Sequence, residues 1–197
     1  MSPILDLIGS AKAYGWGNFS LPGAFESIAT ATASGGETSL VLSSIPQTYK
    51  HLQIRATYKD TYTVSAGRME YQIRFNGSST GYSQHFLIGD GTNKTSVASI
   101  GNAQIRIPAS GISSNSSNSS RVGVSIVDII DYASTTKNKV TRAFAGVESD
   151  INSTEYRVAY GSGIWVNTAA VNSITFLIDS TAFAVGTSFA LYGIKGE

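Results

Sequence analysis

The chain has 197 residues, of which 42% are hydrophobic and 14% charged, and its formal net charge at pH 7 is +1. The 14 Lys and Arg against 13 Asp and Glu form no block of like sign, which argues against the basic stripe that neutralises nucleic-acid phosphates. The lack of cysteine excludes disulfides, thiolate metal sites and cysteine nucleophiles, and it indicates folding in a reducing cytoplasm.

The first stretch, residues 1–24, is predicted to be a retained, extended N-terminal arm. A signal peptide is not expected because the apolar run follows no positive side chain and is interrupted by Pro3 and Asp6. The run is also too short to cross a bilayer, and no later segment approaches ~18 consecutive apolar residues, so we expect no membrane contact. Large side chains between glycines predict that the arm binds a partner; the candidate interface residues are Ile4, Leu5, Leu7, Ile8, Tyr14 and Trp16.

From Phe25 onward apolar and polar residues alternate with the period of two that is typical of β-strands. In residues 51–58 the side chains of Leu52, Ile54 and Tyr58 share one face, and residues 69–75 repeat the pattern. Glycine-rich turns, such as the one predicted at 161–163, separate the strands. Further strands are predicted at Phe25–Thr32, Thr38–Ile45, Ser83–Ile88, Ala103–Ile107, Val122–Tyr132, Val140–Val147, Tyr156–Tyr160, Ile164–Val166, Ser173–Ile178 and Ser188–Ile194.

About ten or eleven short strands, and no apolar stripe at helical spacing, predict an all-β chain. We expect residues 25–197 to form a single domain, an antiparallel two-sheet β-sandwich. A jelly roll suits the length best, although the hydrophobic pattern does not distinguish it from other Greek-key sandwiches. Residues 108–121, rich in Ser and Asn, are predicted to be a long flexible loop within that domain, with an interdomain linker as the alternative.

Few side chains suggest chemistry. His51 and His85 lie in strand patterns without further metal ligands at suitable spacing, so both are interpreted as structural or surface residues. Gly89–Asn93 lacks the acidic positions of a calcium loop and is predicted to be a tight hairpin turn. Trp165 follows a glycine turn, which favours a core position over a sugar-stacking platform.

The carboxylates are also poorly placed for catalysis. Asp128 and Asp131 are three residues apart, which puts them on opposite faces of an extended strand rather than in an acid/base pair. The loop Glu148–Glu155 could bind a cation, but a solvated acidic loop is the preferred interpretation. No nucleophile elbow, phosphate loop or metalloprotease motif occurs. We therefore expect no enzyme activity, no cofactor and no metal.

Several stretches together resemble a family of virion proteins from tailed bacteriophages of marine and freshwater bacteria. The stretches are GSAKAYGWG (9–17), FESIATATASGG (25–36), SSIPQTYKHLQIR (43–55), RFNGSSTGYSQHFLIGDG (74–91) and FALYGIKG (189–196). The resemblance covers about a third of the chain and implies a structural or tail-associated virion protein, without fixing its position in the particle. Residues 112–185 carry no part of the resemblance.

These observations predict a capsid decoration or cement protein that binds and stabilises the capsid lattice through its N-terminal arm and sandwich edges. It is expected to be assembled in the bacterial cytoplasm and to remain in the virion. Its expected partners are the major capsid protein or other virion proteins and further copies of itself, with a trimer favoured. The alternative is a tail or fibre component, including an adhesin that recognises host surface glycans. A glycan depolymerase is the third class, and the missing carboxylate pair argues against it.

Overall fold

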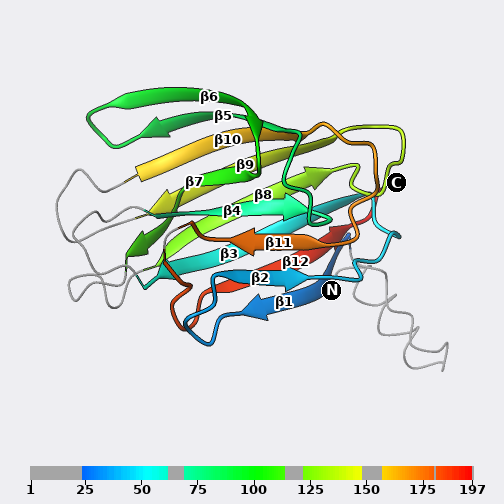
Figure 1. The fold of residues 1–197 in the computed structure, drawn as a ribbon, viewed down its shortest axis with the longest axis horizontal. Helices are drawn as coiled ribbons and strands as arrows, with labels where there is room; N and C mark the ends of the chain where they lie inside the picture. The colour runs from blue at the N-terminus through cyan, green and yellow to red at the C-terminus, as the bar shows by residue number, and fades with distance from the viewer. Residues whose placement is uncertain (1–23, 62–68, 114–121, 148–156, 180, 197) are drawn as a thin grey trace, which may run out of the picture.

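The computed structural model describes residues 24–61, 69–113, 122–147, 157–179 and 181–196, and these ranges contain twelve β-strands and no helix (Figure 1). The first six strands are β1 (Phe25–Thr32), β2 (Ser39–Leu42), β3 (His51–Asp60), β4 (Met69–Phe75), β5 (Tyr82–Gly89) and β6 (Lys94–Asn102). The other six are β7 (Ile105–Ser113), β8 (Gly123–Ile130), β9 (Lys139–Val147), β10 (Arg157–Trp165), β11 (Ile174–Leu177) and β12 (Ser188–Ile194).

The strands form two antiparallel sheets packed as a sandwich, which confirms the predicted fold class. The larger sheet has eight strands in the order β1-β12-β3-β8-β9-β10-β5-β6, and the smaller has four in the order β2-β11-β4-β7. A short parallel contact between the ends of β3 and β7 joins them. The jelly-roll arrangement stays a prediction.

Alternation along the strands builds the core, as the sequence predicts. In β3 the side chains of Leu52, Ile54 and Tyr58 are fully buried between the sheets, while that of Arg55 is exposed. Aromatic rings from both sheets meet in the centre: Tyr71 of β4 packs edge-on against Phe189 of β12, with ring centroids 4.9 Å apart. Such contacts between sheets hold the sandwich together.

Two predicted boundaries are wrong, and close packing explains the first. The turn expected at 161–163 lies inside β10, which runs without a break from Arg157 to Trp165. A Cβ atom on Gly163 would stand 2.7 Å from Thr141 Oγ1 and 2.8 Å from Ile105 Cγ2, so glycine is needed there for close approach of the two sheets. In the second case β7 continues to Ser113, so the stretch 108–121 predicted as a loop begins within a strand.

Candidate binding surface

The larger sheet carries apolar side chains on its outer surface as well as on its inner one. In β8 the buried residues Val127 and Ile129 alternate with Val124 and Ile126, which are exposed on the opposite side. The neighbouring strands β9, β10 and β5 follow the same alternation. Six large side chains, each between 41% and 61% exposed, make up what we call the outer apolar face: Leu87, Val124, Ile126, Phe144, Val158 and Tyr160.

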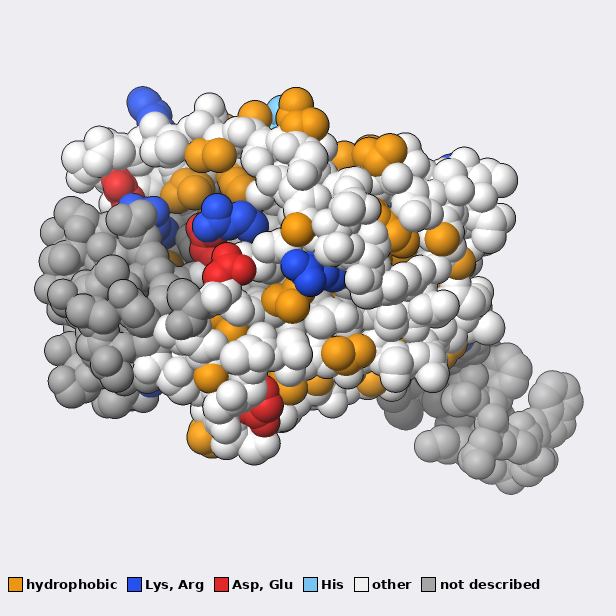
Figure 2. All heavy atoms as spheres, viewed as in Figure 1, with side chains coloured by type: hydrophobic (Ala, Val, Ile, Leu, Met, Phe, Trp, Pro, Cys, Tyr) orange, Lys and Arg blue, Asp and Glu red, His pale blue; other side chains and the backbone are white. Residues whose placement is uncertain are grey.

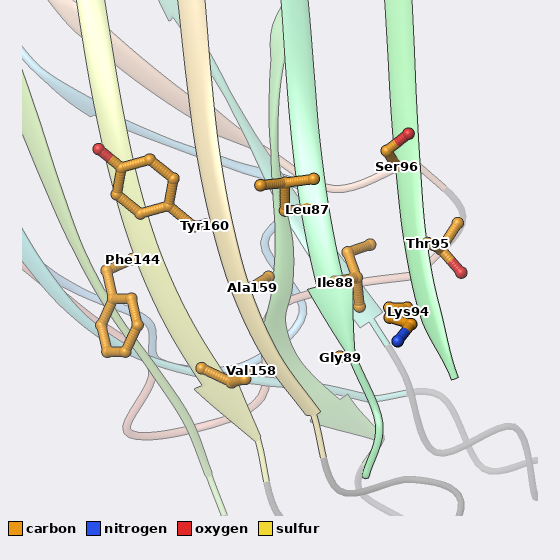
Figure 3. Close-up of a pocket in the computed structure, with 10 residues that line it drawn as sticks. All are labelled: Leu87, Ile88, Gly89, Lys94, Thr95, Ser96, Phe144, Val158, Ala159 and Tyr160. Atoms are coloured by element: carbon orange, nitrogen blue, oxygen red, sulfur yellow. The ribbon is translucent and has the colours of Figure 1, made fainter. Parts of the chain in front are cut away.

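Strand register brings these side chains into contact distance across four strands. Ile126 of β8 lies opposite Phe144 of β9, Phe144 opposite Tyr160 of β10, and Tyr160 opposite Leu87 of β5. Directly opposed residues of antiparallel strands have Cβ atoms about 4.5–5.5 Å apart, so the four side chains form one continuous row. The rings of Phe144 and Tyr160 lie side by side in Figure 3.

A shallow, open hollow of about 600 Å³ lies beside this row (Figure 3). The hollow forms where side chains are missing: Val158 lies opposite Gly146 on one side and Gly89 on the other, and neither glycine has a side chain to fill the surface. Lys94 and Ser96 of β6 provide polar groups at the margin of the hollow.

Hydrogen-bonded polar side chains border the outer apolar face. Asp128 accepts hydrogen bonds from Gln53 Nε2, at 2.8 Å, and from both Nε and Nη2 of Arg142, at 3.1 and 2.7 Å. The hydrogen bonds from Arg142 to this carboxylate raise the pKa of the Arg142 guanidinium above its ordinary value. Arg55 Nε donates a hydrogen bond to Gln53 Oε1, so the polar border continues along β3 to Arg55. Asp128 and Arg142 thus form an ion pair, whereas Arg55 bonds to an uncharged amide, so the border of the face has a small excess of positive charge.

The same pairing of opposite charges is found elsewhere in the described residues. Arg106 lies 2.7 Å from Glu70, and Lys195 pairs with Glu26. On the side of the molecule shown in Figure 2, acidic and basic side chains lie next to each other rather than in a patch of one sign. That nucleic acid is not a direct partner stays a prediction.

The free energy that a partner could gain by covering the outer apolar face depends on how much apolar area the face exposes. Complete burial of one Leu, Val or Phe side chain stabilises by about 1.5–3 kcal/mol. Because about half of each of the six side chains is still exposed, covering the face would contribute roughly 1 kcal/mol per residue. A continuous apolar area of this kind, with a polar border, is typical of a protein–protein interface or a ligand groove.

The residues singled out from the sequence have different locations. The six candidate interface residues of the arm, Ile4, Leu5, Leu7, Ile8, Tyr14 and Trp16, lie outside the described residues, as does the acidic loop Glu148–Glu155. Trp165 is 1% exposed and stacks on Tyr82 with ring centroids 6.0 Å apart, which confirms its core position. The turn Gly89–Asn93 is a hairpin turn in which the Asp90 carboxylate accepts the backbone N–H groups of Thr92 and Asn93.

The two histidines lie on different strands and have no common ligand set. His51 Nδ1 lies 3.0 Å from the backbone nitrogen of Asp131, whose N–H donates a hydrogen bond to it. His85 is exposed on the outer side of β5. Within the described ranges no three His, Asp or Glu side chains are grouped closely enough to hold a metal ion. No helix there is long and apolar enough to span a membrane.

Sequence reasoning missed the outer apolar face, although a signal for it exists. Residues 126–130 place apolar side chains at both odd and even positions, a pattern typical of strands covered on both faces. The smaller sheet covers one side of β8. The other side is exposed in the described structure, so the pattern marks a surface that a partner can cover.

Comparison with known proteins gives no family. No family model matches the sequence, and no curated protein matches it. An exo-inulinase from Aspergillus awamori is 11% identical with a TM-score of 0.34, and the alignment covers 90% of this chain and 30% of that chain. The chain thus spans less than a third of the length of that enzyme.

Two further solved structures overlap with the chain. The CBM40 of the Ruminococcus gnavus IT-sialidase, bound to α2,6 sialyllactose, is 14% identical with a TM-score of 0.32, and the alignment covers 84% of this chain and 92% of that one. A chain in the structure of black queen cell virus is 10% identical with a TM-score of 0.20, and the alignment covers 83% of this chain and 64% of that chain. Overlaps this weak carry no argument about function, which has to be derived from the surface of the molecule itself.

Proposed function

We propose that this protein is a structural component of a bacteriophage virion, which attaches to other virion proteins through the outer apolar face of its larger sheet and through its N-terminal arm. The observation that carries the proposal is the continuous row Ile126, Phe144, Tyr160 and Leu87, exposed on a regular sheet. Such a row stabilises an assembly only when a second surface covers it. The phage assignment itself rests on the resemblance of the sequence stretches given above.

For the position of the protein in the particle, we keep the order of preference that the sequence predicts. A decoration or cement protein on the capsid lattice is the first choice, with the major capsid protein as partner. A tail or fibre component is the second. A β-sandwich suits both roles, because either one requires stable attachment.

The test compares virions that carry the wild-type chain with virions that carry the double variant Phe144→Thr/Tyr160→Thr. Threonine keeps the β-propensity of both positions but removes the rings, so we expect the variant to fold. Loss of two central aromatic anchors should weaken attachment by about 2 kcal/mol or more, which corresponds to roughly thirty-fold. The measurement is the copy number per virion by quantitative mass spectrometry, alongside the melting temperature of the purified protein.

A matched control and the contrary outcomes make this test decisive. Val41→Thr removes a side chain that is 55% exposed on β2 of the smaller sheet, away from the outer apolar face, and should leave occupancy unchanged. Wild-type copy numbers on the order of hundreds would favour the head, and about a dozen or fewer would favour the tail. Absence of the wild-type chain from purified virions, or equal occupancy of the double variant, would refute the proposal.

Glycan binding is a second candidate, favoured by Phe144 and Tyr160 on one side of the hollow and the polar groups of Lys94 and Ser96 on the other. Aromatic rings on a sheet surface provide an apolar platform for sugar rings, and polar groups at the margin can bind hydroxyls. An array of bacterial surface oligosaccharides would test this role. Binding by the wild type that is lost in Phe144→Thr/Tyr160→Thr and kept in Val41→Thr would favour an adhesin over a decoration protein.

A further inference from the structure

The edge strand β6 differs from the other edges of the sandwich. Among the described strands it pairs with β5 alone, and its side chains are largely exposed, including Ile100 at 85%. At the opposite edge of the larger sheet, β1 has a register shift near its middle, between Ser27 and Ala29, and the edge strand β2 of the smaller sheet spans four residues. The register shift between β5 and β6 lies beyond Ile100, near the end of β6, and leaves residues 94–100 in regular pairing. Bulges and short strands protect edges from pairing with another chain. Residues 95–100 contain neither a charge nor a proline.

Hydrogen-bond alternation shows which backbone groups of β6 point outward. The N–H of Asp90 donates to the carbonyl of Asn93 at 3.2 Å, which makes these two residues a hydrogen-bonded pair at the turn. Pairing then continues without a shift from Gly89 opposite Lys94 to Ser83 opposite Ile100. Because hydrogen-bonded and non-bonded pairs alternate in an antiparallel ladder, residues 95, 97 and 99 bond to β5. The N–H and C=O groups of residues 94, 96, 98 and 100 therefore point away from the sheet.

We propose that two copies of this chain pair antiparallel through β6, about a two-fold axis at Val97. In this register Ser96 lies opposite Ala98 of the second copy, and Lys94 lies opposite Ile100. The four residues of one copy whose N–H and C=O groups point outward then lie opposite the same four residues of the second copy. Each of these four opposed pairs can share two hydrogen bonds, which gives up to about eight. Registers centred on Ser96 or Ala98 allow about six, so the geometry selects Val97 as the centre.

The charges and side chains of β6 suit a second copy of the same strand. Its one charged residue is Lys94, at its beginning. In the proposed register the two lysines are six residues apart along the strands, roughly 20 Å, which exceeds the Debye length of about 8 Å at physiological salt. The two Val97 side chains, each 43% exposed in one copy, meet at the axis on the same side of the joined sheet.

Self-pairing has a direct consequence for attachment, and this step rests on the proposed function. A two-fold axis perpendicular to the sheet places both outer apolar faces on one side of a continuous sheet. Two linked surfaces can engage neighbouring subunits together, and the second contact then forms at high effective concentration. A weak contact per copy would thereby become stable attachment.

Cysteine cross-linking of the purified full chain tests the register, because the sequence contains no cysteine of its own. Val97→Cys should form a disulfide-linked dimer under mild oxidation, since opposed Cα atoms of a non-hydrogen-bonded pair are about 4.5 Å apart. Thr95→Cys is the matched control, two residues away on the same side of β6 and also exposed. Its two Cα atoms would be roughly 13 Å apart, too far for a disulfide. We expect at least a ten-fold difference in dimer yield on a non-reducing gel.

Sedimentation of the unmodified protein provides the second measurement. The wild type should form dimers, and Ala98→Pro should be monomeric, because proline removes an outward N–H and no bond to β5. If that variant loses its circular-dichroism spectrum, Ala98→Lys replaces it as a charged edge that resists pairing. A monomeric wild type, a trimer insensitive to both changes, or equal cross-linking at positions 95 and 97 would overturn the inference. None of these readouts involves virions, so failure here is distinguishable from failure of the proposed function.

Discussion

Lys139, at the start of β9, is a fully buried lysine whose replacement by methionine should destabilise the protein strongly. Its ammonium group donates hydrogen bonds to three backbone carbonyls: Ser134 O at 2.7 Å, Lys137 O at 2.6 Å and Thr168 O at 3.1 Å. The side chain therefore ties the segment between β8 and β9 to the segment that follows β10. Methionine keeps the length and volume but leaves all three carbonyls without this donor.

The size of the effect follows from opposing contributions. Hydrogen bonds to a charged group contribute about 1.5–3 kcal/mol each, so three of them give roughly 4.5–9 kcal/mol. Replacing the ammonium also removes its desolvation penalty, which is several kcal/mol. We expect a net loss of about 3 kcal/mol in the free energy of unfolding. For a domain of this length that corresponds to a fall in melting temperature of roughly 6–12 °C.

Thermal unfolding monitored by circular dichroism, together with urea titration, measures this loss. Lys137→Met is the matched control, because Lys137 Nζ pairs with Asp131 at 2.7 Å but its side chain is 62% exposed. An exposed ion pair contributes at most about 1 kcal/mol. If Lys139→Met lost no more stability than Lys137→Met, the reasoning that the buried ammonium satisfies these carbonyls would be refuted.

Two further predictions concern the loop after β1 and the close approach of the sheets. Hydrogen bonds from Ser34, its hydroxyl first, lower the pKa of Glu37 from 4.5 to about 2. The stability that this carboxylate contributes is therefore present above about pH 4.5 and is lost as the pH falls through about 2. Between these two pH values the melting temperature of Glu37→Gln should fall less steeply than that of the wild type. Gly163→Ala should destabilise by about 1–3 kcal/mol in urea titrations, whereas Gly146→Ala, whose Cβ would stand 3.7 Å from its nearest neighbour, should be nearly neutral. Equal effects of the two alanines would contradict the close-packing argument.

The sequence predicts the strands with one buried face, because burial imposes a period of two on them. β3 is the clearest case, with Leu52, Ile54 and Tyr58 inward and Arg55 outward. The pattern is less complete in β4, where Gln72 belongs to the predicted polar face but is 2% exposed. It donates a hydrogen bond to Asp179, and a polar residue that gains such a partner can be buried without showing it in the pattern.

Strands without a buried face, or with an unusual need for glycine, could not be found in this way. β6 was not predicted, because an exposed edge imposes no alternation on residues 94–102. β10 was divided in two, because Gly161 and Gly163 look like a turn although they serve close packing. Both errors have the same origin, since the local pattern does not reveal which other strand lies opposite a residue.

The candidate binding surface depends on register even more strongly. Phe144 and Tyr160 are sixteen positions apart in the sequence, and only the pairing of β9 with β10 makes them neighbours. Their individual exposure could be predicted from alternation, but their contiguity with Ile126 and Leu87 could not. The interface role of the arm residues, from Ile4 to Trp16, stays a prediction.

The pairing of β1 with β12 places a restriction on when the larger sheet can be completed during synthesis. Phe25 lies opposite Ile194, and β12 also pairs with β3, so it is inserted between the two strands. Until β12 leaves the ribosome, β1 has no partner in the larger sheet and β3 has an unpaired edge. At about 5–20 residues per second, the delay between synthesis of β1 and of β12 is on the order of ten seconds or more. During that interval the unpaired edges of β1 and β3 are open to pairing with other chains.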